Sequence, residues 1–518
     1  MAKKLHVNLF EMNCVSHIIH GLWAHPTNNR HRFNELSYWT KLAQLLEHGA
    51  FDSVFLADVI GTYDGFRDGP ETALREAVQI PSNDPLLVIP AMAAVTKNLG
   101  FGATFSTTYE PPFAFARRAS TLDHLTKGRF AWNIVTSYLP NAARNFGLEC
   151  EVPHDERYVI ADEYLDVLYK LWEGSWDDDA VIQDRERRIF TDPAKVRYIN
   201  HEGPQFKVAG PHLCSPSRQR TPVLYQATGS HAGKEFAARH AEAVFTGGMN
   251  AEAVRTNIAD MRARLVRHGR KPTDIKFITG AGIITGRTDV EVAKKLEEYR
   301  RLISVDGRLA HSQSRIDYAK YPRSERLADI IARKDPGYDQ IGPRFKPEQT
   351  IGEVLDQLGG INYGRYFVAG TPSVVADAIE KWLDEDDIDG INLVQYHSYD
   401  TARDFIEYVV PELRRRGRYR ESYNDGETLR ERLFGAGRAR LPDYHYGARY
   451  RDPTRLKDPF QPLTVPPKSA EADALSMHEQ RERTTPGTAA TVPVKPPSAR
   501  PAALSSSPEK NLATATTP

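Results

Sequence analysis

The 518-residue sequence has only three cysteines, Cys14, Cys150 and Cys214, and no excess of charge of either sign. Three scattered cysteines are too few for a disulfide framework or a tetrathiolate metal site, and they are compatible with a reducing cytoplasm. The sequence contains 68 basic residues (Lys and Arg) and 68 acidic residues (Asp and Glu). The protein therefore has no net positive charge that would attract a nucleic acid or an acidic membrane surface. We therefore expect a cytoplasmic protein that binds a small molecule at a local site.

Long apolar runs and several catalytic signatures are also absent. No segment approaches the roughly 20 consecutive apolar residues that a membrane-spanning helix requires. The segment from Met1 to Phe10 contains no apolar run long enough for a signal peptide, and its second half is predicted to form a first strand. There is no His-Glu-x-x-His zinc motif, no Gly-x-Ser-x-Gly nucleophile elbow and no Walker loop. We therefore expect no metal site, and the chemistry has to come from a bound organic cofactor.

Short apolar runs alternate along the chain with amphipathic helical segments, which is typical of parallel strands joined by helical crossovers. Several such runs separated by helices favour a closed (β/α)8 barrel of the TIM type over an open sheet. The predicted strands are Val7–Phe10, Ser53–Ala57, Phe101–Ser106, Phe130–Val135, Val223–Gln226, Ala243–Thr246, Lys276–Ile284 and Gly390–Gln395.

Two helices are marked clearly by apolar residues at helical spacing. Ser37–His48 is followed by Gly49, a typical helix stop, and Asp155–Trp172 carries an apolar stripe that should cover the outside of the barrel.

A single barrel domain is expected over residues 1–450, with two insertions at about 175–222 and 300–361. Long insertions in a barrel usually shape the mouth of the pocket. No aromatic residue follows Phe460, and the last residues are rich in Pro, Ala, Ser and Thr. Such a composition buries too little apolar surface to offset the entropy of ordering, so residues 462–518 are predicted to be a disordered tail.

Barrel enzymes place their functional residues just beyond the carboxyl ends of the strands. Asp58, Thr104, Asn133 and Ser230 occupy such positions. Ser230 lies in a glycine-bearing turn that leads directly into a helix, an arrangement in which backbone N–H groups and a hydroxyl can hold a phosphate. The alternative is an ordinary serine N-cap.

A second candidate group comprises His154 and Tyr158, which lie one helical turn apart and could contact the same ligand. A third is the loop after the first strand, which is dense in histidine and aromatic residues and suits a mostly apolar pocket with a few polar contacts. Structural ordering of the loop is the competing interpretation. Metal binding by His17, His20 and His25 is disfavoured because no carboxylate or cysteine is suitably spaced.

With these residues in view, the sequence resembles the bacterial-luciferase-like superfamily, and within it the branch of nitrilotriacetate, dibenzothiophene-sulfone and dimethylsulfide monooxygenases. The resemblance covers roughly residues 4–450. The segments that carry it are Phe51–Asp58, Arg117–Arg129 with Trp132-Asn133, His154–Tyr158, Asp389–Leu393 and Tyr408–Leu413.

The resemblance implies a barrel that binds reduced FMN, forms a flavin C4a-peroxide with O2 and inserts one oxygen atom into the substrate. It also implies a partner flavin reductase that uses NADH or NADPH, and a homodimer or homotetramer. The positions that match the family's flavin contacts are Asp58, Thr104, His154, Tyr158 and Ser230. One departure is Thr228, where many relatives have glycine.

In this interpretation His17 and His154 are the candidate catalytic residues, and Phe10, Trp23 and His25 line the substrate pocket. Segments such as Cys14–His17, Tyr38–Thr40 and Tyr169–Trp176 most resemble the dimethylsulfide monooxygenases of this branch, and this resemblance implies a small organosulfur substrate similar to dimethylsulfide. An aminopolycarboxylate or an aromatic sulfone is the first alternative. A deazaflavin-dependent hydride transferase and a non-catalytic flavin-binding protein are alternatives of a different kind.

Overall fold

The computed structural model describes residues 3–248, 250–341, 345–362 and 366–466. Among these residues, eight parallel strands close into a barrel, because β10 pairs with both β9 and β11. All eight predicted strands, and with them the predicted barrel, are confirmed. In their order around the barrel the strands are β1 (His6–Met12), β2 (Ser53–Ala57), β3 (Gly100–Ser106), β4 (Phe130–Val135), β9 (Val223–Ala227), β10 (Ala243–Phe245), β11 (Lys276–Thr285) and β13 (Gly390–Val394).

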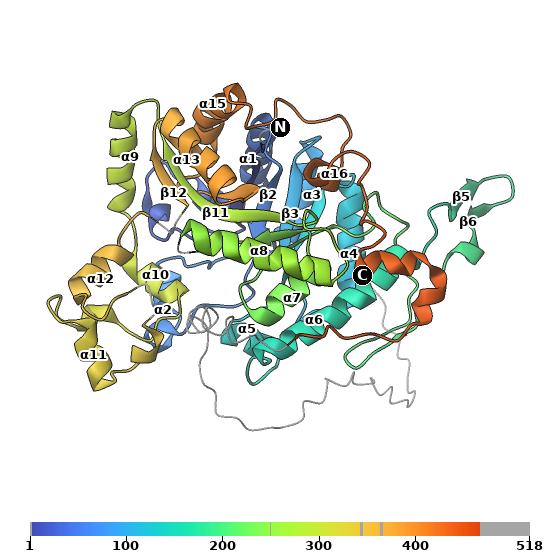
Figure 1. Ribbon diagram of the computed structural model, residues 1–518, viewed down its shortest axis with the longest axis horizontal. Coiled ribbons are helices and arrows are strands. Elements are labelled where there is room, and N and C mark those ends of the chain that lie inside the picture. Colours follow the sequence, from blue (N-terminus) through green and yellow to red (C-terminus); the bar gives the residue numbers. More distant parts are fainter. Residues whose placement is uncertain (1–2, 249, 342–344, 363–365, 467–518) are drawn as a thin grey trace, which may run out of the picture. The chain divides into compact units, whose positions relative to one another are not determined.

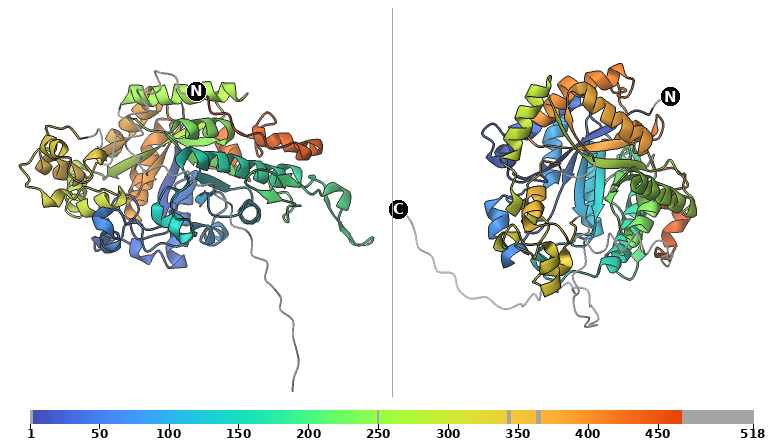
Figure 2. Two further views of the ribbon diagram at one scale, coloured as in Figure 1. Left: turned by 90° about the horizontal axis from the view of Figure 1, so that it is seen from below. Right: turned by 60° about the vertical axis from the view of Figure 1, so that its left-hand side comes forward.

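Helices surround the strands on the outside of the barrel (Figure 1, and Figure 2, right). The helices around the barrel are α1 (Leu36–His48), α3 (Ile89–Ala94), α4 (Pro112–Leu125), α6 (His154–Tyr169), α7 (His231–His240), α8 (Ala251–Arg267), α9 (Asp289–Arg300), α13 (Pro372–Glu385) and α15 (Val410–Arg415). The helix predicted over Asp155–Trp172 is present as α6, and it continues as a π-helical stretch, Lys170–Gly174. The short helices α2 (Glu71–Arg75), α5 (Pro140–Asn145) and α14 (Asp400–Asp404) lie in connecting segments.

The strands are apolar almost throughout because they are covered on both faces. Their outer residues join the helices in one large core. A smaller cluster combines strand residues such as Phe55 and Tyr225 with Leu429 and Leu433 of α16 (Leu429–Phe434). The backbone N–H of Leu429 also donates to Gly128 O, just before β4, so α16 covers the amino-terminal end of the barrel.

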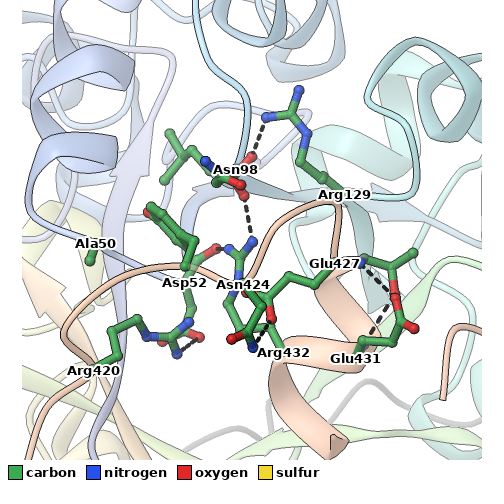
Figure 3. A network of polar contacts seen from close by, with 12 residues as sticks. Ala50, Asp52, Asn98, Arg129, Arg420, Asn424, Glu427, Glu431 and Arg432 are labelled. Atoms are coloured by element: carbon green, nitrogen blue, oxygen red, sulfur yellow. Dashed lines mark hydrogen bonds and ion pairs between the residues drawn. The ribbon is translucent and has the colours of Figure 1, made fainter. Parts of the chain in front are cut away.

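A network of charged residues fixes α16 in this position (Figure 3). The buried Arg432 guanidinium donates to Asp52 O (2.9 Å) and Asn98 O (2.6 Å), and to the Glu427 carboxylate (2.8 Å). The Asp52 carboxylate pairs with Arg420 and also accepts from Val7 N (2.8 Å). Since Asp52, Asn98 and Val7 lie at the starts of three neighbouring strands, this network fastens the carboxyl-terminal part of the chain to the amino-terminal end of the barrel.

The first insertion contains two small antiparallel hairpins, β5–β6 (Val181–Asp184 and Ile189–Thr191) and β7–β8 (His201–Glu202 and Lys207–Val208). The second insertion contains α10 (Val305–His311), α11 (Leu327–Arg333) and α12 (Ile351–Leu358), and it leads into an additional strand, β12 (Phe367–Gly370), on the second half of β11. An apolar cluster joins this insertion to the segments that follow β2 and β4. Figure 1 accordingly shows α10 beside α2.

The end of the described chain crosses α6 and α7. Most of the predicted disordered tail, residues 467–518, lies outside the described residues. The last described residues, 461–466, are held mainly by their backbone. The contacts are Arg239 Nη2 to Gln461 O (3.0 Å), Leu463 N to Asp162 Oδ2 (2.7 Å) and His231 Nε2 to Pro466 O (2.8 Å). Within the described parts of the chain, no helix combines the length and the apolar character that crossing a membrane demands.

Candidate active site

Three hydroxyl groups converge at the amino-terminal end of α7. Ser230 is the N-cap, and its Oγ accepts a hydrogen bond from Gly233 N (3.1 Å). A Cβ on Gly233 would collide with the Thr228 hydroxyl and would lie 2.6 Å from the Tyr158 hydroxyl oxygen. The Thr228 Oγ1 atom is buried and has no hydrogen-bond partner among the described residues. Ser230 is therefore an N-cap, as in the ordinary interpretation, but it also belongs to a hydroxyl-lined cradle that suits a phosphate.

His154 and Tyr158 reach this cradle from the start of α6. Their rings lie 5.3 Å apart, and the Tyr158 ring packs 5.7 Å from Phe236 of α7. The His154 side chain is 41% exposed, and its Nδ1 lies 2.7 Å from Asp155 Oδ1. Tyr158 thus faces the cradle directly, whereas His154 lies at its solvent edge.

Several polar side chains lie inside the barrel near the carboxyl ends of its strands, and two of their buried oxygen atoms accept no hydrogen bond from the described residues. Thr104 of β3 lies opposite Asn133 of β4, and Asn133 Nδ2 donates to Thr104 Oγ1 (2.9 Å). Asn133 Oδ1 and Gln226 Oε1 are buried and have no hydrogen-bond partner within the part of the chain that the structure describes. Because unpaired buried acceptors are costly, these two oxygens are suited to receive N–H or O–H groups of a ligand.

Asp58 follows β2 at the same end of the barrel. Burial, with a contribution from the nearby Asp84 carboxylate, raises the pKa of Asp58 to about 7. Such a group can be a carboxylic acid that donates a hydrogen bond or a carboxylate that accepts one, depending on pH near neutrality.

His17 lies in an apolar setting at the end of β1. Its ring makes an edge contact with Phe10 (4.4 Å between centroids), and Phe10 in turn contacts Phe55. Burial, reinforced by the positive charge of Arg30, holds the pKa of His17 well below its usual value. Arg30 forms a buried ion pair with Glu11 (2.8 Å). His17 is therefore a neutral imidazole, and the charges nearest to it are matched.

A chain of hydrogen bonds that sequence reasoning missed joins four segments around the barrel mouth. The chain runs Tyr138–Tyr63 (2.7 Å), Tyr63–Gln79 (3.0 Å), Gln79–His311 (3.4 Å), His311–His20 (2.8 Å) and His20–Ser16 (3.0 Å). The Gln79 amide nitrogen can only donate, so His311 accepts at Nε2 and donates from Nδ1 to His20. His20 then donates from its other ring nitrogen to the Ser16 hydroxyl.

We call this chain the mouth network. Burial lowers the pKa of His311 to about 4 and that of His20 well below its usual value, so both rings are neutral. The only signal in the sequence was the histidine-rich loop that contains His20. Nothing in the sequence paired that loop with His311, which lies in the second insertion.

Trp23 and His25 lie apart from the other pocket candidates. Trp23 is 41% exposed. His25 Nδ1 lies 3.2 Å from His397 Nε2, and its ring contacts Tyr299. The structure therefore brings Phe10 and His17 together and places Trp23 and His25 in the outer part of the same loop.

A closed parallel barrel with a hydroxyl-lined cradle and a buried polar lining at its carboxyl end is the architecture of a cofactor-dependent barrel enzyme. The profile of the Luciferase-like monooxygenase family matches residues 12–384, and the chain belongs to this family of flavin-dependent monooxygenases.

Named relatives match the chain almost from end to end. The long-chain alkane monooxygenase of Geobacillus thermodenitrificans (strain NG80-2) is 53% identical over 87% of this chain and 99% of the relative. The dimethyl-sulfide monooxygenase of Hyphomicrobium sulfonivorans is 44% identical over 92% of this chain and 99% of the relative.

Crystal structures support the same relationship. Those of a long-chain alkane monooxygenase and of the Hyphomicrobium enzyme each align over 87% of this chain and over 100% and 96% of their own, with TM-scores of 0.80 and 0.79. A riboflavin lyase described with modified FMN is 36% identical and aligns over 87% of this chain and all of its own, with a TM-score of 0.77. The predicted family, the barrel and the monooxygenase class are thereby confirmed.

Proposed function

We propose that this chain is the oxygenase component of a two-component system, in which a separate flavin reductase uses NADH or NADPH to supply reduced FMN. The observation that carries this proposal is the cradle at α7, where the hydroxyls of Ser230, Thr228 and Tyr158 surround Gly233. The unpaired Thr228 Oγ1 is explained if it donates its proton to a phosphate oxygen. The FMN-containing relative supports the choice of flavin.

The other site residues have complementary roles in this proposal. His154 borders the phosphate from the solvent side. Thr104, Asn133 and Asp58 would hold the ring system and the ribityl chain, because the unpaired Asn133 oxygen suits a ring N–H and Asp58 suits a hydroxyl. When bound, reduced FMN supplies the electrons that activate O2.

His17 is proposed to act next to the reacting atoms as a neutral hydrogen-bonding group. Its lowered pKa argues against a role as a cationic acid. Together with Phe10 it excludes water from the inner wall of the pocket, which favours oxygen transfer over loss of peroxide. Trp23 and His25 are proposed to form the outer rim through which the substrate enters.

The substrate is proposed to be an uncharged, apolar compound that is oxygenated at a saturated carbon. The buried arginine near His17 is already paired with Glu11, and His17, His20 and His311 are neutral. Neither Arg30 nor these three histidines therefore offers a free cation to the carboxylates of an aminopolycarboxylate. The small organosulfur substrate expected from the sequence meets this description, and so does a long-chain alkane, the substrate class of the relative with 53% identity.

The test is oxygen uptake by the purified protein with FMN, NADH and an unrelated flavin reductase. Hexadecane, dimethyl sulfide, dibenzothiophene sulfone, nitrilotriacetate and no substrate are compared, and products are analysed. An alcohol from hexadecane, or methanethiol and formaldehyde from dimethyl sulfide, supports the proposal and decides between the two substrates. Turnover of nitrilotriacetate alone would overturn the uncharged-substrate assignment.

Two further expectations from the sequence remain predictions. A homodimer or homotetramer can be checked by light scattering. A cytoplasmic location can be checked by fractionating the cells that produce the protein.

A further inference from the structure

Helix α10 of the second insertion carries His311 to the mouth of the barrel, and its backbone lies unusually close to the loop after β1. Ser304 N, at the N-cap of α10, donates to His20 O (3.0 Å). A Cβ on Gly307 would lie 2.7 Å from the Cβ of His20, so there is no room for a side chain between the helix and the loop. A small displacement of α10 would therefore separate His311 from His20.

One arginine outside the insertion forms hydrogen bonds to both ends of α10. Arg67, in the segment after β2, donates to Asp306 in the first turn of α10 (2.8 and 3.3 Å) and to Asp317 beyond its end (2.8 and 3.0 Å). Arg75 makes a further contact with Asp306 (3.0 Å). We call Arg67, Asp306 and Asp317 the clamp.

The backbone of Arg67 is in an unfavourable conformation for a residue with a side chain. Its φ of 59° and ψ of 29° lie in the left-handed region, which glycine adopts without strain. An arginine that is held in such a conformation at a junction between segments is expected to be kept for its contacts. The four donor–acceptor contacts of the clamp are those contacts.

We propose that Arg67 is a positioning residue that acts through α10, holding the second insertion against the barrel so that His311 stays in the mouth network. Isolated surface ion pairs add little to global stability. A planar guanidinium shared between two carboxylates, however, restricts geometry as well as adding charge attraction. The clamp therefore fixes the mouth locally, and it weakens as salt screens the charges. Its effect on turnover rests on the proposed function, whereas its effect on α10 does not.

The test uses full-length Arg67→Ala, Arg67→Gly and Arg67→Lys variants and measures hydrogen exchange at the amides of residues 305–320. Loss of the clamp should raise exchange by about five- to tenfold in both the Ala and the Gly variants. Arg67→Lys should restore part of the protection. Arg67→Gly separates the two explanations because it relieves the backbone strain and still removes the contacts. Faster exchange in Arg67→Ala alone would assign the effect to strain and overturn the proposal.

Salt provides an independent readout that backbone strain at position 67 would not move. Between about 0.05 and 0.5 M NaCl, exchange over 305–320 should accelerate in the wild type and stay nearly constant in Arg67→Ala. The matched control is Arg416→Ala, which removes contacts with Asp377, Glu380 and Glu412 on α13 and α15. It should leave exchange over 305–320 unchanged. Unchanged exchange in both Arg67→Ala and Arg67→Gly would sink the proposal.

Turnover measurements then connect the clamp to the site. With the substrate that the oxygen-uptake assay identifies, Arg67→Ala should raise KM and lower the fraction of O2 uptake that yields product. Its affinity for flavin should not change. Equal KM and coupling in the variant and the wild type would overturn the link to the mouth. If Ser230→Ala also leaves flavin affinity unchanged, the proposed flavin site fails, but the exchange experiment still decides the clamp.

Discussion

Ser230 has two roles at the residue scale, because its hydroxyl caps α7 and also borders the cradle at Gly233. Replacing it with alanine should weaken FMN binding by about 1 to 3 kcal/mol, the cost of losing a hydrogen bond to a charged group. Flavin titration measures this change. Thr288→Ala is the matched control, since Thr288 caps α9 through Glu291 N. That variant should lose some stability and keep its flavin affinity; equal affinity in all three proteins would contradict the phosphate assignment.

Asp58 should make the stability of the ligand-free protein depend on pH. Its pKa of about 7 in the folded chain is above the value near 4 of an unfolded aspartate, so the folded state holds the proton more tightly. Stability from this group is therefore fully present below about pH 4 and is lost as pH rises to 7.

Asp58→Asn removes this loss. Denaturant unfolding at pH 4 should give free energies of unfolding that differ between the variant and the wild type only by the effect of the substitution itself. As the pH rises to 7, the variant should become more stable relative to the wild type. A difference in stability that does not vary with pH would show that the pKa of Asp58 is not raised in the folded chain.

At the scale of elements, α16 depends on Arg432, whose side chain is 1% exposed and serves two backbone carbonyls and Glu427. Arg432→Ala leaves those acceptors without their donor and should destabilise the protein by about 3 to 5 kcal/mol, as removal of one partner of a buried ion pair does. Thermal unfolding measures the loss.

Arg415→Ala is the control for that variant, because the Arg415 side chain is 70% exposed and pairs with Glu412 at the surface. Its effect should stay within about 0.5 kcal/mol. Similar melting temperatures for Arg432→Ala and the wild type would mean that α16 is not needed to close the end of the barrel.

At the scale of the whole molecule, residues 461–466 connect the carboxyl-terminal part of the chain to the helix that carries the cradle. A chain that ends at Pro466 keeps the contacts to Arg239, Asp162 and His231, and it should melt at the temperature of the full-length protein. A chain that ends at Asp458 loses all three and should melt several degrees lower, and it should also bind flavin more weakly. Equal melting temperatures for the two shortened chains would show that this segment contributes nothing to the fold.

The sequence by itself determined the strands, the barrel and the family, because each depends on local pattern. A short run of apolar residues marks a strand such as Ser53–Ala57, whatever that strand packs against. A residue that directly follows a strand of a parallel barrel lies at the carboxyl end of the strands, where barrel enzymes place their functional residues. Asp58, Thr104 and Ser230 were therefore within reach of the sequence.

Only the tertiary structure decided which distant residues meet. The packing of α6 against α7 brings Tyr158 to Gly233, and the pairing of strands leaves Asn133 Oδ1 without a partner among the described residues. The second insertion brings His311 to His20 across 291 positions. Such contacts follow from how whole elements pack, and no local spacing encodes them, which is why the mouth network and the clamp could be read only from the folded chain.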